Sequence, residues 1–433
     1  MRGHNRRVTE PSENSKNAPP DIPQSADTIG PDDKPRSTSR IESRSTLPIT
    51  LFVQAAASAA LIAPAVAAPA LMKSLAVGPV AIGTYVATVY MGAMLSSLYG
   101  VALVQRWGAI RTSQIALIVC ASGITLVVVP NVYSALLGSF IVGLGYGPIT
   151  PASSHMLART TPPERIALVF SIKQTGVPLG GALAGLIVPF GLQYGGIPLA
   201  LGQISVLCVL AAVLAESLRR LLDAMRVGGG SLPGIGQLMK PIRFVLTHHL
   251  LRQLAVVSFV FSIVQVCVTS YLVAYLTSDL AWGIVAAGAA LSLTQGAGMV
   301  GRVTWGVLAD RFNARAVLIG LALTMAAAGL GMSLLRPDTA HWIVSLLLVV
   351  YGATAVGWNG VYLGTVAKCV PHDQAASATG GTLFFTYFGV VIGPPLFGAI
   401  GGASGGLGIA YALLTLPLIW MMWTLARTRW DAS

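Results

Sequence analysis

The chain has 433 residues and a formal net charge of +12, yet only 10% of its residues are charged and 54% are hydrophobic. A soluble globular chain carries roughly 25% charged residues, so this one could not cover a globular surface with polar groups. The composition indicates an integral membrane protein and argues against a secreted disulfide scaffold or a cytosolic enzyme. The four cysteines stand singly in the sequence without metal-ligand spacing, so no metal site is expected.

Residues 1–46 differ in composition from the rest of the chain. They include no aromatic residue and six prolines, together with many Ser, Asp and Arg residues. Such a segment cannot bury enough apolar surface to offset the entropy lost on ordering. We therefore expect a disordered cytoplasmic tail, followed by a first apolar run that begins near Leu47.

Twelve apolar runs follow the tail, and each is about long enough to cross a hydrocarbon core about 30 Å thick. Continuous apolar runs of this length are helices, because every backbone polar group must be satisfied within the lipid. The predicted spans are 47–72, 79–104, 112–129, 132–157, 166–190, 197–217, 252–276, 282–308, 316–335, 341–367, 376–400 and 407–426.

A polar connector separates the first six spans from the last six. The predicted domains are therefore the tail 1–46, a first bundle 47–217, the connector 218–251, a second bundle 252–426 and a cytoplasmic C-terminus 427–433.

The basic residues predict the orientation in the membrane. With both termini in the cytoplasm, 23 of the 27 Lys and Arg residues lie on the cytoplasmic side, two lie outside and two lie within spans. Cytoplasmic loops carry this excess in membrane proteins, so we expect a multi-pass protein of the plasma (inner) membrane. The positive charge then reflects topology and contact with anionic lipid, and no nucleic-acid partner is expected.

An internal repeat relates the two sets of spans. The fifth and eleventh spans match at an offset of 213, beginning with Gly176 and Gly389, and the second and eighth match at an offset of 205 through Arg106 and Arg311. A repeat of this kind predicts two similar six-helix halves around a midplane site that opens to either side. Small residues in such spans favour close helix packing. The glycines expected to pack are Gly176, Gly180, Gly181, Gly185, Gly389 and Gly393.

The loop after the eighth span reads Gly306-Val-Leu-Ala-Asp310-Arg311-Phe-Asn313-Ala-Arg315. It resembles the cytoplasmic loop signature of the major facilitator superfamily, Gly-x-Leu-Ala-Asp-Arg-x-Gly-x-Arg, with Asn313 at the second glycine. The resemblance implies an all-α membrane fold of twelve helices in two pseudo-symmetric six-helix bundles. It also implies a bacterial-type secondary transporter that works by alternating access.

The equivalent loop of the first half keeps Arg106, Gly108 and Arg111 but has Gln105 where the family has Asp. In the family this Asp helps to hold the two halves together in the outward-open state. The resemblance therefore implies that this contact depends on Asp310 and Arg311 in the present chain.

Two cations lie within predicted spans that contain no carboxylate at mid-membrane. They are Lys173 in the fifth span and Arg302 in the eighth. A buried cation is costly unless it is paired, so the expected partner is an anionic substrate, held by the planar fork of Arg302 and the point charge of Lys173. In the alternative interpretation, Lys173 extends to the cytoplasmic interface and Arg302 makes a structural pairing.

Polar and aromatic side chains near the middle of the spans complete the predicted substrate site. Each has an alternative interpretation, because glutamines there also join helices and aromatic rings also pack against them. The candidate residues besides the two cations are Gln54, Tyr90, Gln174, Gln265, Gln295, Trp358, Asn359 and Tyr387.

The sequence thus predicts a secondary active transporter of a small organic anion, a mono- or dicarboxylate, with H⁺ as the candidate coupling ion. Two alternatives are efflux of hydrophobic or toxic compounds, as in drug/proton antiporters, and a transporter-like membrane sensor. No enzymatic activity and no cofactor are expected, because paired carboxylates and a nucleophile with a base at recognisable spacing are missing from the sequence. The expected state is a monomer in the lipid bilayer.

Overall fold

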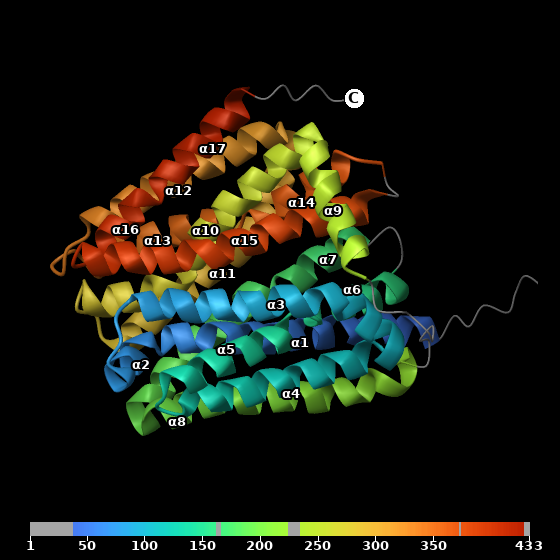
Figure 1. Ribbon diagram of the computed structural model, residues 1–433, viewed down its shortest axis with the longest axis horizontal. Coiled ribbons are helices and arrows are strands. Elements are labelled where there is room, and N and C mark those ends of the chain that lie inside the picture. The colour runs from blue at the N-terminus through green and yellow to red at the C-terminus, as the bar shows by residue number, and fades with distance from the viewer. Residues whose placement is uncertain (1–37, 162–165, 224–233, 372–373, 428–433) are drawn as a thin grey trace, which may run out of the picture.

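Figure 1 shows the computed structural model, which describes residues 38–161, 166–223, 234–371 and 374–427. These residues form helices joined by short turns, with no strand among them. Most of the expected tail, residues 1–37, lies outside the described residues, as do 224–233 of the connector and 428–433 of the C-terminus.

The described residues of the first half form eight helices. The first of them starts at Thr38, earlier than the expected Leu47, because residues 38–46 are polar but contain no Pro or Gly that would stop a helix. The helices of the first half are α1 (Thr38–Val66), α2 (Ala68–Leu75), α3 (Val80–Trp107), α4 (Ala109–Val128), α5 (Val132–Tyr146), α6 (Ile149–Thr160), α7 (Ile166–Gln174) and α8 (Gly176–Leu222).

The second half repeats the pattern after a helix in the connector. That connector helix, α9 (Ile235–Thr247), packs against two spans of the second half. The helices that follow it are α10 (His249–Ser278), α11 (Ile284–Arg311), α12 (Ala314–Leu334), α13 (His341–Ala355), α14 (Asn359–Lys368), α15 (Ala375–Ala403), α16 (Leu407–Leu413) and α17 (Thr415–Arg427).

Eleven helical segments of the described chain are long and apolar enough to cross a membrane, and one of them, Ile172–Arg219, has 48 residues. Its backbone leaves the helical conformation at Gly195 and Gly196, and Gly196 has a φ of 64°, which favours glycine. A segment of 48 residues is about twice the length needed to cross the bilayer, so it contains most of the predicted fifth span and all of the sixth. The twelve-helix fold is therefore confirmed.

Several spans of the described chain are interrupted, among them the fourth, the fifth and the tenth. The fourth breaks between α5 and α6 at Gly147 and Pro148, and the tenth breaks between α13 and α14 at residues 356–358. The fifth breaks at Thr175, between α7 and α8, where Pro178 follows. A proline cannot bond to the carbonyl four residues earlier, so Pro178 leaves the carbonyl of Gln174 without its helical partner.

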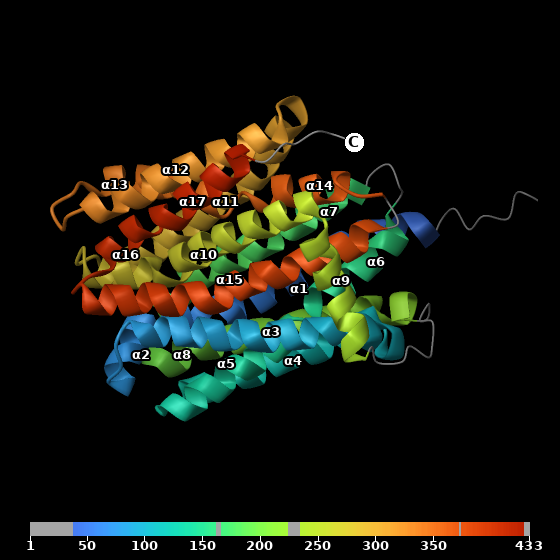
Figure 2. The same ribbon diagram turned by 45° about the horizontal axis from the view of Figure 1, so that its top comes forward.

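The two halves lie against each other along their length, the first in blue and green and the second in yellow to red (Figures 1 and 2). Helix α3 packs against α15, α8 packs against α11, and α1 contacts α10. Packing of small residues supports the repeat. Gly143 has no side chain, so the backbone of the second span of its half approaches it at Val89. Gly352 is contacted in the same way by the backbone of the second span of its own half, at Thr294. The two glycines are 209 positions apart and their two partners are 205 apart.

The halves meet closely at the end of the bundle where α2 and α16 lie (Figure 1). We call this contact the distal seam and define it by Pro79, Gly83, Tyr271, Pro394 and Gly398. A side chain at either glycine would collide with the other half, and the Tyr271 hydroxyl lies 3.2 Å from the carbonyl oxygen of Pro79 and 2.8 Å from that of Pro394. The seam closes the distal end between α3, α10 and α15.

Candidate functional site

Lys173 and Arg302 lie on facing helices of the two halves, α7 and α11. Both are buried, with 1% and 9% of their surface exposed, and their charges repel each other. Among the described residues Lys173 has neither a hydrogen bond nor an ion pair. A lone ammonium group within a span costs about 2.5–3.5 kcal/mol on insertion scales. Lys173 thus provides a buried positive charge without a counterion.

Arg302 has partners, and they come from both halves. Its Nε donates to the carbonyl oxygen of Val356 at 3.1 Å, and a terminal nitrogen donates to that of Gln174 at 2.6 Å. Both carbonyls lie where a span is interrupted, and helix ends leave such oxygens without an intrahelical partner. In this arrangement Arg302 makes the structural pairing and links α7 of the first half to α13 of the second.

Tyr146 lies beside Arg302, at the end of α5. Its hydroxyl is close enough to Arg302 for an electrostatic interaction and is next to the side chains of Gln54 and Ser58 on α1. Its ring lies 6.5 Å from that of Tyr90, which in turn lies 6.1 Å from that of Tyr387 on the other half. We call these side chains the central cluster: Lys173, Arg302, Tyr146, Gln54, Ser58, Tyr90 and Tyr387.

Gln265, Trp358 and Asn359 form a second group, within the second half. The Trp358 indole donates to the Oε1 atom of Gln265 at 2.8 Å, and the Asn359 amide donates to the same oxygen at 3.2 Å. Trp358 is 1% exposed and packs against Phe261 and Tyr362. The structure therefore places Trp358 in the packed interior, where its contact with Gln265 orients that amide.

Gln295 and the candidate packing glycines lie at helix crossings. The Gln295 amide occupies the space that a side chain at Gly181 would need, and its Oε1 atom has no partner among the described residues. The remaining glycines approach helix backbones or side chains of α1, α10 and α11. They are Gly176 and Gly180 against α1, Gly185 against α11, and Gly389 and Gly393 against α10.

The loop signature of the second half marks the turn between α11 and α12. Asn313 caps α12, since its side chain accepts a hydrogen bond from the backbone N–H of Arg315 at 2.8 Å, and Arg315 donates to the carbonyl oxygen of Ala426. Arg311 is exposed, and a side chain at Gly306 would meet open space. The side chain of Asp310 lies outside the described part of the structure, so its expected contact stays a prediction.

The loop of the first half is held by an acid that sequence reasoning missed. Asp223, just beyond α8, accepts hydrogen bonds from the backbone N–H groups of Ile110 and Arg111 at 2.9 and 3.0 Å. It packs against Gly108, whose φ of 90° suits glycine. The side chain of Arg106 is exposed. Asp223 therefore ties the loop to its own half.

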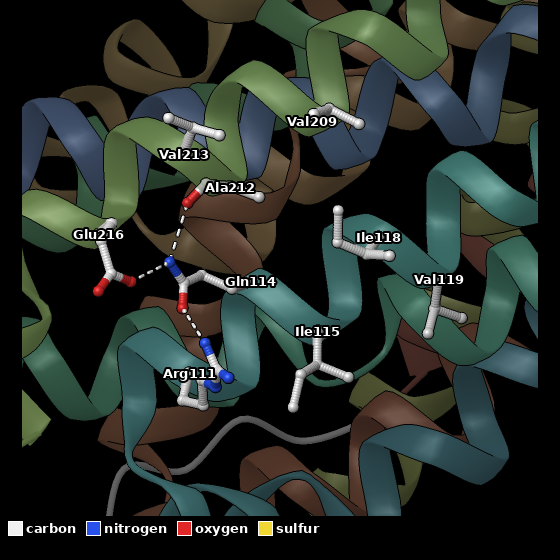
Figure 3. A pocket seen from close by; sticks show the side chains of 9 residues that line it. All are labelled: Arg111, Gln114, Ile115, Ile118, Val119, Val209, Ala212, Val213 and Glu216. Atoms are coloured by element: carbon white, nitrogen blue, oxygen red, sulfur yellow. Dashed lines mark hydrogen bonds between the residues drawn. The ribbon is translucent and has the colours of Figure 1, made fainter.

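Figure 3 shows a groove beside this loop, between α4 and α8, with an apolar wall and a polar end. The polar end is a chain of hydrogen bonds: Arg111 donates to Gln114 at 3.5 Å, and Gln114 donates to Glu216 at 2.8 Å and to the Ala212 carbonyl at 3.0 Å. Arg111 thus lies far from the central cluster and contributes to the structure of the loop.

The arrangement of two bundles around a central polar cluster matches a known family. The sequence profile of the Major Facilitator Superfamily covers residues 49–394. The chain belongs to this superfamily. Its long apolar helices are those of a membrane-spanning protein of this superfamily.

Three bacterial relatives illustrate the range of the family. An MFS-type transporter of Mycobacterium tuberculosis is 25% identical over 60% of this chain, and the chain spans only 57% of that relative's length. The hexuronate transporter of Bacillus subtilis is 22% identical over 86% of this chain and 92% of its own. The benzoate transport protein of Acinetobacter baylyi is 25% identical over 77% and 78%.

A solved structure supports the fold independently. The crystal structure of a point mutant of the nucleoside transporter NupG matches with a TM-score of 0.75 at 14% sequence identity, covering 89% of this chain and 99% of NupG. At this identity the match extends to the arrangement of the helices only. The expected fold class is thus borne out for this chain.

Proposed function

We propose that this transporter moves a small organic anion, a mono- or dicarboxylate, by alternating access between its two halves. The observation that carries the proposal is Lys173, a buried cation with no partner among the described residues, next to a second cation, Arg302. Two adjacent buried positive charges favour an anion between or beside them, since a carboxylate would relieve both the repulsion and the cost of burial.

The carboxylates of the described chain that have defined partners lie at or near helix ends. Glu216, in the last two turns of α8, accepts a hydrogen bond from Gln114 and pairs with Arg219. Asp223 caps the start of α4, and Asp279 accepts a hydrogen bond from the N–H of Leu407 at 2.6 Å at the start of α16. Burial raises the pKa of Asp279, which lies just outside its span. None of these acids contacts Lys173, so the negative charge that Lys173 requires is assigned to the substrate.

The relatives favour the same chemistry. Hexuronate and benzoate are both carboxylates, and the transporters named for them align with most of this chain. Export of hydrophobic compounds gives the two buried cations no such role, and the sensor alternative would require an output segment. We further propose that the protein is a monomer in the inner membrane, with both termini in the cytoplasm, and that transport is coupled to H⁺.

In this proposal, the contacts of Arg302 change between the two conformations of the protein. Its bond to the Gln174 carbonyl joins the halves while the distal seam is closed. When the halves rock apart at this level, the guanidinium loses that carbonyl and gains a place for a carboxylate oxygen. Lys173 would then bind the anion in both states and Arg302 mainly in one.

Uptake into proteoliposomes tests the proposal. With radiolabelled benzoate and glucuronate as probes, Lys173→Ala should lower kcat/KM at least about 30-fold, the equivalent of the roughly 2 kcal/mol lost with one buried charged contact. Lys173→Arg should restore part of the uptake. Arg302→Ala should also impair it, whereas Lys73→Ala, at an exposed cation, serves as the matched control.

Unimpaired uptake by both Lys173→Ala and Arg302→Ala would contradict the anion proposal. Increased sensitivity of a deletion strain to toxic hydrophobic amines, reversed by the wild-type gene and by Lys173→Ala alike, would favour efflux. Deleting residues 1–37 should leave uptake unchanged, whereas a sensor that signals through this segment would lose its response.

A further inference from the structure

Gln54 and Gln265 occupy the first spans of the two halves, α1 and α10, which contact each other across the interface. Gln54 is fully buried and Gln265 is half-buried. Each can accept through one amide oxygen and donate through one NH₂ group. What these amides present to a substrate depends on which of their atoms the protein already uses.

The protein uses the oxygen of both amides. The Thr150 hydroxyl lies 3.3 Å from the Oε1 atom of Gln54, while the Trp358 indole and the Asn359 amide both donate to the Oε1 atom of Gln265. An indole N–H can only donate, so the atom that faces it must be oxygen. The NH₂ group of Gln265 must therefore point away from Trp358 and Asn359.

The two arrangements are related by the internal repeat. Thr150 and Asn359 are 209 positions apart, the same offset as Gly143 and Gly352, and each follows the interruption of its span. The repeat-related glycines Gly176 and Gly389 contact Gln54 and Ser262, respectively, so Ser262 is the position equivalent to Gln54. Gln265 therefore lies about one helical turn further along α10 than that equivalent position. Both halves thus use a group from their interrupted fourth helix to fix a glutamine of their first helix.

The donors of Gln54 and Ser58 make no hydrogen bond within the described chain, although the Tyr146 hydroxyl lies beside both side chains. The Gln54 Nε2 atom is buried without a partner among the described residues, and so is the Ser58 Oγ atom one turn further along α1. No hydrogen bond of the described chain involves the Gln265 NH₂ group. Native proteins rarely keep buried polar groups unpaired, and the exceptions are often functional. The ligand that would satisfy these donors is rich in acceptor oxygens.

We infer that Gln54 and Gln265 are specificity residues, one from each half, whose NH₂ groups bind hydroxyl or carbonyl oxygens of the substrate. The inference rests on the proposed anion transport and narrows it. The carboxylate binds at Lys173, and the rest of the substrate carries hydroxyl groups that reach the two amides. A hydroxylated acid is then preferred over an apolar acid of the same size.

Ligand binding to the purified full-length protein tests this with two probes of matched ring size. Glucuronate and cyclohexanecarboxylate both carry one carboxylate on a six-membered ring, but only glucuronate carries hydroxyl groups. By isothermal titration calorimetry, Gln265→Leu should weaken glucuronate roughly fivefold, the fold-change of one neutral hydrogen bond, and change cyclohexanecarboxylate less than about twofold. Lys173→Ala should weaken both probes.

The matched variants separate a binding role from a structural one. Gln54→Leu removes a fully buried amide, so Thr150→Val, which keeps the shape of the side chain and removes its hydroxyl, provides a second test in the same half. Thr150→Val should lower the preference for glucuronate without changing binding of cyclohexanecarboxylate. In the other half, Asn359→Leu should do the same by releasing the Gln265 amide.

The outcomes are distinguishable. Equal weakening of both probes by Gln265→Leu and Thr150→Val, or no weakening of either, would overturn the inference while leaving the anion site intact, provided that Lys173→Ala weakens both. Tighter binding of cyclohexanecarboxylate than of glucuronate by the wild-type protein would also overturn it. Binding of both probes that is indifferent to Lys173→Ala, or no binding of either, would overturn the proposed function together with the inference.

Discussion

The distal seam and the central cluster are both contacts between the same two halves, yet they are built in opposite ways. In the seam, glycines allow backbones to touch, and the polar side chain involved, Tyr271, has carbonyl partners in both halves. In the cluster, Lys173, the Gln54 Nε2 atom and the Ser58 Oγ atom are buried and make no hydrogen bond with the described residues.

The difference indicates that the seam holds the two halves together, whereas the cluster binds a ligand. A seam of backbone contacts and satisfied hydrogen bonds stabilises one arrangement of the halves without needing any other molecule. A cluster of buried donors and cations is incomplete by itself, because unpaired buried groups cost about 1–3 kcal/mol each. An anion rich in acceptors would complete the cluster, whereas the seam must open for the substrate to pass.

The largest effect should come from Gly83, at the centre of the seam. A methyl group there would collide with the carbonyl of Pro394, so Gly83→Ala should destabilise the closed seam by about 1–3 kcal/mol, as overpacking does. Spin labels can be attached at positions 78 and 402, where a side chain would meet open space. The distance between the two labels, measured by double electron–electron resonance, should lengthen.

A matched glycine supplies the control for that change. Gly320, in α12, would have open space around an added methyl group, so Gly320→Ala should raise helix stability by about 0.5–1 kcal/mol and leave the label distance unchanged. Opposite signs for the two substitutions would identify the seam as a packed contact. The same small gain at both positions would show that Gly83 tolerates a side chain and that the seam is loose.

The next effect concerns Asp223, which caps α4 from across the half. Asp223→Ala removes the acceptor for two backbone N–H groups and should lower the melting temperature, at a cost of about 0.5–2 kcal/mol for a lost cap. Calorimetry in detergent measures the change. Asp338→Ala, at an exposed acid, is the control, and an equal effect of the two would argue that the cap contributes nothing to stability.

The smallest effect should come from the Tyr271 hydroxyl. Tyr271→Phe keeps the ring in its packed position and removes one donor, which should weaken the closed seam by about 1 kcal/mol. The spin-label distances should show a modest shift towards the open state. Tyr133→Phe, at a residue 82% exposed, should leave them unchanged, and a silent Tyr271→Phe would assign the seam to the glycines alone.

The sequence predicts more of the fold than of the candidate site. Apolar runs and a repeat predict twelve spans in two halves, since lipid leaves few alternatives for a backbone. Pro178 could also have predicted that the Gln174 carbonyl is freed, but only packing brings Arg302 to it. Asp223 reaches its partners across more than a hundred positions, and such a contact has no local signal.

Two site residues show the same limit. Trp358 was expected in the cavity because it is aromatic at mid-span, and it packs inside the second half instead, where it fixes Gln265. Tyr146 was missed, although the Gly147-Pro148 pair beside it signals an interrupted span, and such interruptions often line transport sites.

The measurement that tests the central claim most directly is thermal stabilisation of the detergent-purified protein by small carboxylates, amines and neutral solutes. A ligand that binds only the folded state stabilises it by about 2.7 kcal/mol at one hundred times its Kd. The account predicts that a carboxylate raises the melting temperature and that Lys173→Ala removes the shift while Lys73→Ala preserves it. Stabilisation by amines or neutral solutes alone, or a carboxylate shift that survives Lys173→Ala, would contradict it.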